Sequence, residues 1–98
     1  MKIERTLIHE MTIAEFAEKH NLVMEIHERG LPVGNPGRFY AHFKHADTKE
    51  GHILCGEYGD GATPLAAVMA YATAISLKML VIDAYEDTRR EIRVPRLK

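Results

Sequence analysis

The stretch that decides the fold is residues 59–76, GDGATPLAAVMAYATAIS. Glycine reaches backbone angles that other residues resist, so Gly59 and Gly61 predict a sharp turn. Thr63 is suited to cap the exposed amides of a helix, and Pro64 fits the first helical position. The sequence therefore predicts a turn that leads directly into a second helix, which follows an earlier one near the N-terminus.

That earlier helix is predicted at residues 13–20. Thr12 and Glu15 have the spacing of a capping box, in which each side chain bonds the backbone amide of the other residue. Asn21 can end the helix in the left-handed conformation. Both ends of this helix are thus marked in the sequence.

Alternating apolar and polar residues predict antiparallel strands between and after the helices. The first two strands should pair with Arg29 opposite Arg38. The chain order then predicts an α+β fold of the type α-β-β-β-α, with the helices on one face of an antiparallel sheet. The predicted segments are strands at 22–29, 38–45 and 52–58, a turn at 47–51, and a C-terminal hairpin or extension built from 78–84 and 90–94.

Composition describes one domain. The chain has 98 residues, of which 46% are hydrophobic and 28% charged, so we expect a single domain at 11–98 preceded by an N-terminal arm at 1–10. The formal net charge of -1 gives no overall attraction to nucleic acid or to an acidic membrane. Cys55 is the single cysteine, which excludes an internal disulfide and fits a cytoplasmic protein without a membrane partner.

Residues 28–76 resemble the double-stranded-RNA-binding domain. The resemblance rests on an acidic first strand, a glycine and proline loop, the aromatic second strand RFYAHF at 38–43, and a glycine turn before an alanine-rich helix. RNA-binding members of that family carry lysines on the first turns of this helix, and residues 64–68 here are PLAAV. The resemblance implies the fold, and we expect RNA binding to be no stronger than non-specific association.

A longer similarity, over residues 12–95, is to small proteins of phages and prophages. It is carried by TP, YA and IS within 63–76, by LVIDAY at 80–85 and by RREIRVP at 89–95. The pattern of two strands followed by a helix is also similar to HicB-type antitoxins. The similarity implies an accessory or regulatory protein that binds a host or phage protein.

Three residues were considered for catalysis. Glu25, His42 and Cys55 would lie in a row if the third strand has one register, and a slip by one residue would instead bury Cys55 in the core. His45 and His52 flank the predicted turn without a third metal ligand. We therefore predict no enzyme, no metal and no cofactor. The remaining histidines suggest no such cluster: His9, His20 and His27.

The second helix is apolar on two sides. One side is predicted to bind a protein partner or a second copy of the chain, because small residues allow close approach and a tyrosine supplies a large anchor. The alternative is that the C-terminal segment covers this side. The predicted partner residues are Ala67, Ala70, Tyr71 and Ala74.

The C-terminal segment is basic. It could hold an acidic protein surface or a nucleic-acid backbone, although charges on an edge strand also serve to block aggregation. The sequence thus predicts a non-enzymatic protein that binds a protein partner, with nucleic-acid binding through this segment as the alternative. The basic residues concerned are Arg89, Arg90, Arg93 and Arg96.

Overall fold

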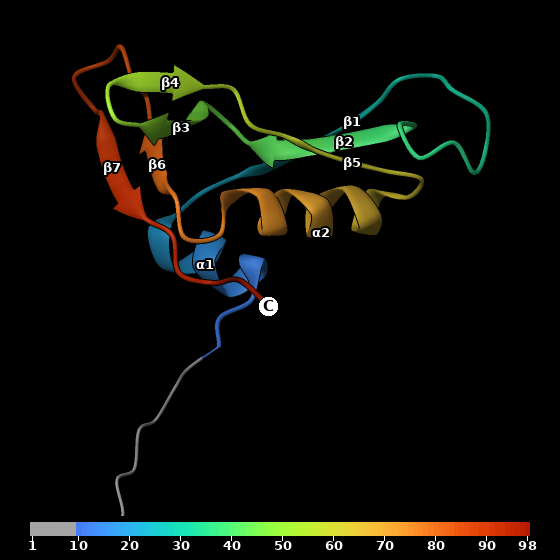
Figure 1. The fold of residues 1–98 in the computed structure, drawn as a ribbon, viewed down its shortest axis with the longest axis horizontal. Coiled ribbons are helices and arrows are strands. Elements are labelled where there is room, and N and C mark those ends of the chain that lie inside the picture. The colour runs from blue at the N-terminus through green and yellow to red at the C-terminus, as the bar shows by residue number, and fades with distance from the viewer. Residues whose placement is uncertain (1–9) are drawn as a thin grey trace, which may run out of the picture.

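Two helices and two antiparallel sheets make up the α+β fold, seen in a computed structural model that describes residues 10–98 (Figure 1). Both helices lie on the same side of the strands. The predicted arm at 1–10 falls, apart from Glu10, outside the described residues. In chain order the elements are α1 (Ile13–His20), β1 (Met24–Glu28), β2 (Phe39–Phe43), β3 (Ala46–Glu50), β4 (Ile53–Cys55), β5 (Gly59–Gly61), α2 (Pro64–Ile75), β6 (Met79–Ile82) and β7 (Arg90–Arg93).

The strands form one sheet in the order β1-β2-β5 and another in the order β4-β3-β6-β7. The chain passes from the first sheet into the second between β2 and β3, where His45 has a φ of 60°. The predicted alignment of the first two strands is confirmed, because the amide of Arg29 donates to the carbonyl of Arg38 at 2.8 Å. The C-terminal hairpin is also confirmed, as β6 pairs with β7.

The predicted turn at 47–51 is wrong, and the predicted third strand at 52–58 is a strand only at Ile53–Cys55. Residues 46–50 form β3, and residues 52–58 contribute β4 to one sheet before the chain enters β5 of the other. The reason is long-range pairing, because Thr48 lies opposite Leu80 of the apolar strand β6. Thr48 is buried. Its hydroxyl donates to the Glu57 carboxylate at 3.2 Å, so this polar group has a hydrogen-bond partner inside the protein. Tertiary pairing thus overrides the local turn preference.

Helix α1 begins and ends as predicted. The Glu15 amide donates to the Thr12 hydroxyl at 3.1 Å, and the Thr12 amide donates to the Glu15 carboxylate at 3.2 Å. Asn21 ends the helix with a φ of 55°. Ile13 and Phe16 are buried, so the helix packs on the rest of the protein through its apolar side.

Helix α2 packs on the three-stranded sheet through its contact with β5. A Cβ atom added to Gly59 would overlap the backbone nitrogen of Tyr71 and stand 2.5 Å from the carbonyl oxygen of Ala67, and one at Gly61 would overlap the Ala67 nitrogen. Neither glycine has a positive φ. The prediction that they form a sharp turn is therefore wrong, since they are needed to let the helix backbone reach the strand.

The C-terminal segment ties the two helices together. The Leu97 amide donates to the Ser76 hydroxyl at the end of α2, and the Lys98 amide donates to the Met11 carbonyl before α1, both at 3.0 Å. One apolar core results, shared by both helices, both sheets and this segment. Its buried members are Ile13, Phe16, Phe43, Tyr71, Ala72, Ile75, Leu80, Ile82, Val94 and Leu97.

The two helix caps give a first test of the fold. Thr63 accepts a hydrogen bond from the Ala66 amide at 3.1 Å, in the same way as Thr12 does for α1. Replacing either threonine by alanine should lower the free energy of unfolding by about 1 kcal/mol, because a helix amide loses its partner. Urea denaturation of both variants measures this, with Thr88→Ala as the control, since Thr88 caps no helix and its hydroxyl makes only an exposed hydrogen bond to Asp83. Stability equal to the control in both cap variants would contradict the assignment.

Candidate functional site

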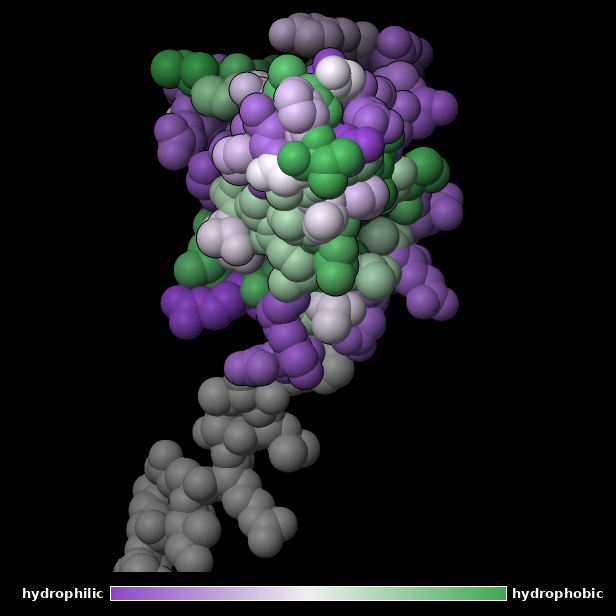
Figure 2. All heavy atoms as spheres, turned by 90° about the vertical axis from the view of Figure 1, so that its right-hand side faces the viewer, coloured by the Kyte–Doolittle hydropathy of each residue, from purple (hydrophilic) through white to green (hydrophobic). Residues whose placement is uncertain are grey.

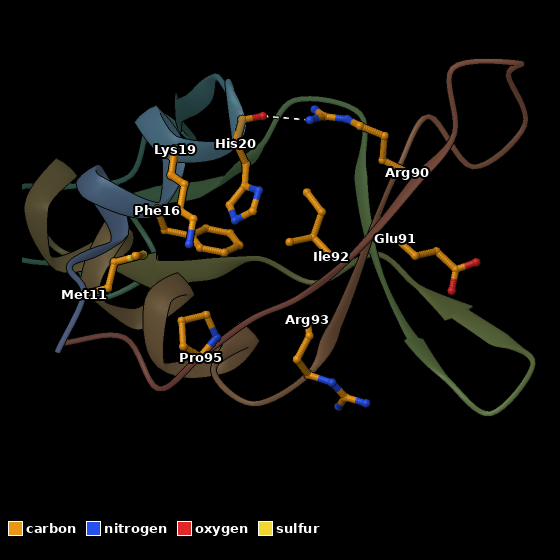
Figure 3. A pocket seen from close by; sticks show the side chains of 9 residues that line it. All are labelled: Met11, Phe16, Lys19, His20, Arg90, Glu91, Ile92, Arg93 and Pro95. Carbon is orange, nitrogen blue, oxygen red and sulfur yellow. Dashed lines mark hydrogen bonds between the residues drawn. The ribbon is translucent and has the colours of Figure 1, made fainter. Parts of the chain in front are cut away.

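A groove runs between α1 and β7, with a volume of about 710 Å³ (Figure 3). It lies where the chain just before α1, the helix itself and the last strand come together, so residues far apart in sequence share it. We call it the α1–β7 groove. Its lining residues are Met11, Phe16, Lys19, His20, Arg90, Glu91, Ile92, Arg93 and Pro95.

The floor of the groove is apolar and aromatic. The rings of Phe16 and His20 lie 4.6 Å apart on the same side of α1, and Ile92 projects toward them from β7 (Figure 3). The pKa of His20 is lowered, first by burial and then by the charges of Lys19 and Arg90. This lowering favours the neutral form of His20, and the ring adds surface to the floor.

Arg90 holds the two walls of the groove together. One of its guanidinium nitrogens donates to the carbonyl oxygen of His20 at 2.8 Å, as the dashed line in Figure 3 marks. That carbonyl belongs to the last turn of α1, so no amide of the helix is available to bind it. A positive charge at this end is also favoured by the helix dipole. The bond fixes the start of β7 against the end of the helix.

The border of the groove is positively charged. Lys19 contributes from α1, while Arg90 and Arg93 contribute from β7. Glu91, the acidic residue of the lining, and Arg93 lie on the other side of β7 from Ile92 and point away from Phe16 and His20 in Figure 3. The Glu91 carboxylate accepts hydrogen bonds from Lys49 and Arg89, both at 3.2 Å, and these bonds lower its pKa. The cations that border the side of β7 facing α1 are therefore Lys19 and Arg90.

The predicted basic segment is divided by the structure. Arg90 and Arg93 line the groove, as described. Arg89 is held by the Ala84 carbonyl and by Glu91, each at 3.2 Å, and Arg96 is exposed outside the lining. The sequence missed the role of Lys19, which only the packing of α1 beside β7 brings to the same border.

The predicted partner surface on α2 is corrected by the structure. Tyr71 and Ala67 are 1% and 0% exposed, because this side of the helix lies on the three-stranded sheet, and Ala70 and Ala74 are half-buried beside them. Burial raises the pKa of Tyr71 to about 12. The alternative of a C-terminal cover is also wrong, since β5 and β2 provide the cover.

The opposite side of α2 faces outward instead. Leu65 is 71% exposed and Met69 is 43% exposed on this side. Figure 2, which faces the start of α2, shows apolar side chains interspersed with polar ones at this end of the molecule. These apolar side chains are scattered among polar neighbours, as is common on protein surfaces.

The predicted catalytic row is only half formed. Glu25 lies opposite His42 as expected, whereas Cys55 pairs with Thr48 in the other sheet and is exposed. Neither predicted position of Cys55, beside His42 or in the core, is therefore correct. His27, for which the sequence suggested no cluster, lies on the same face as Glu25 and His42. The confirmed strand register was the signal that could have shown this.

The pair His45 and His52 does not come together in the structure. His45 precedes β3 and His52 follows it, so the two lie at opposite ends of a five-residue strand, too far apart to share one ion. His9 lies outside the described residues.

Comparison with protein-family models, with curated proteins and with solved structures finds no match to this chain. Within residues 10–98, neither helix has the length and apolar character needed to cross a membrane.

Proposed function

We propose that this protein is a non-enzymatic accessory or regulatory factor that binds an acidic segment of a partner protein in the α1–β7 groove. The observation that carries the proposal is an apolar floor bordered by cations, held in shape by the bond from Arg90 to the end of α1. A role of this kind is what the resemblance of residues 12–95 to small phage and prophage proteins implies.

The two parts of the groove make different contributions to binding. Burying one leucine or phenylalanine side chain against the half-buried His20 and Ile92, above the buried Phe16, contributes about 1.5–3 kcal/mol. An exposed ion pair to Lys19 contributes about 0–1 kcal/mol and mainly accelerates association. We therefore expect a partner segment with one or two apolar anchors between acidic residues.

Nucleic acid fits this groove less well. Non-specific binding to a phosphate backbone needs several cations in a row, and its affinity falls steeply with salt. Here Arg89 is paired with Glu91, and the formal net charge is -1. The apolar floor has no counterpart on a phosphate backbone. Nucleic-acid binding through Arg90, Arg93 and Arg96 remains the second candidate.

A labelled peptide tests the proposal. The probe is a short fluorescent peptide in which glutamates alternate with phenylalanines, followed by fluorescence anisotropy. Lys19→Glu should weaken binding about tenfold, because one attraction becomes a repulsion, and Ile92→Ala should weaken it by a similar factor through lost apolar contact. Lys44→Glu is the matched control, since Lys44 is exposed and outside the groove.

Three results would contradict this function. One is unchanged affinity in both groove variants, and another is an equal loss in Lys44→Glu. The third is stronger binding of a single-stranded oligonucleotide that the groove variants also weaken, which would favour the second candidate.

A further inference from the structure

A second group of side chains lies outside the groove, on the face of the three-stranded sheet opposite α2. Ala41 and Gly59 lie opposite each other and face the helix, so the residues that alternate with them point to the other side of the sheet. On this open face lie Glu25, His27 and His42, which we call the sheet triad.

The strand register brings the triad together. Glu25 and His42 are directly opposite each other on β1 and β2, and His27 is two residues further along β1. The rings of His27 and His42 have their centres 5.2 Å apart. The three candidate ligand atoms all lie within 4.8 Å of one another, and all three residues are half-buried.

Neighbouring groups orient both imidazoles. Nδ1 of His42 lies 3.0 Å from the carbonyl oxygen of Phe43, which can only accept, so Nδ1 carries the proton and Nε2 keeps its lone pair. Hydrogen bonds of this kind, from the second ring nitrogen to a carbonyl, orient histidines that bind metals. On the other side, Tyr40 stacks on His27 with the ring centres 4.6 Å apart and restricts its rotation.

The carboxylate of Glu25 is not used elsewhere in the described part of the chain. Within residues 10–98 it makes no hydrogen bond or ion pair. Arg29, a cation on the same face, is bound instead to Asp60 at 2.6 Å and lies over the Tyr40 ring at 4.4 Å. A negative charge and two imidazole nitrogens therefore face the same space without a cation between them.

We propose that the sheet triad binds one divalent transition-metal ion of the Zn²⁺ class. Two imidazoles and one carboxylate are a ligand set that zinc accepts, with water in the fourth tetrahedral position, whereas Mg²⁺ and Ca²⁺ prefer oxygen ligands alone. Ligand distances of about 2.0–2.2 Å require the three atoms to draw closer by side-chain rotation, which their partial exposure permits. This site is independent of the groove and of its proposed partner.

The test is isothermal titration of the full chain, free of any histidine tag, with ZnCl₂. We expect one Zn²⁺ per chain and at least a tenfold weaker affinity in each of Glu25→Gln, His27→Gln and His42→Gln, because each removes one ligand. His52→Gln is the matched control, as His52 is exposed and lies in the turn between β3 and β4. Circular dichroism establishes that each variant is folded.

Cobalt gives a second measurement that needs no variant. Co²⁺ added to the unaltered protein should produce the intense visible absorption of a tetrahedral site, and Zn²⁺ should displace it. The proposal is overturned if this absorption does not appear, if Zn²⁺ does not bind, or if the folded triad variants bind Zn²⁺ as strongly as His52→Gln does.

Discussion

Gly59→Ala should lower the free energy of unfolding by at least about 3 kcal/mol. This is the upper end of the usual cost of adding a methyl group where the protein is already closely packed. The added Cβ would overlap the Tyr71 nitrogen and stand 2.5 Å from the Ala67 carbonyl oxygen. These are backbone atoms of α2, so no side-chain rotation relieves the overlap, and the helix must move away from β5. Denaturation in guanidinium chloride followed by circular dichroism measures the loss.

Gly56 supplies the control for this substitution. A Cβ there would have only the Asp47 carboxylate oxygen nearby, at 4.0 Å, and the residue does not have a positive φ. Gly56→Ala should therefore change stability by no more than about 0.5 kcal/mol. Similar stability of the two variants would show that α2 does not approach the sheet as closely as described.

Tyr71→Ala should cost about 3–5 kcal/mol, the range for truncating a large aromatic side chain in a core. Tyr71 is 1% exposed, and its ring contacts Phe43 edge to face with the centres 5.5 Å apart. Tyr85, which is 90% exposed, is the matched control, and Tyr85→Ala should be nearly neutral. Thermal and urea unfolding of both variants give the comparison.

A milder substitution separates the contribution of the Tyr71 hydroxyl from that of its ring. Burial raises the pKa of Tyr71 from its ordinary value of 10.0 to about 12 in the folded protein. The folded state thus favours the protonated phenol, and the stability this gives is fully present below about pH 10 and lost as the pH rises through about 12. Tyr71→Phe should reduce that alkaline loss.

If Tyr71→Ala instead kept its stability and changed only its elution volume, Tyr71 would belong to a partner interface.

Local signals were enough to predict several elements. The capping box at Thr12 and the stop at Asn21 define α1 because they involve residues close in sequence. The register of β1 with β2 could also be predicted from the sequence. Apolar and polar residues alternate on both strands, and few alignments of the two strands bury Ala41 and Phe43 together.

The remaining features depend on contacts between distant segments. Residues 46–50 have turn-forming side chains, and their pairing with β6 makes them a strand. Helix α2 is apolar on two sides, so periodicity alone could not choose which side packs on the sheet. Lys19 and Arg90 are far apart in the sequence, and both line the groove only because α1 packs beside β7.

The most direct test of the proposed function is to locate peptide binding on the protein by amide NMR. With assigned resonances, the acidic peptide of alternating glutamate and phenylalanine is titrated into the full chain. Binding in the α1–β7 groove predicts the largest shift changes at Lys19, His20 and Ile92, with small changes on the open sheet face. Largest changes on that sheet face or along the outer side of α2, or none at saturating peptide, would contradict the proposal.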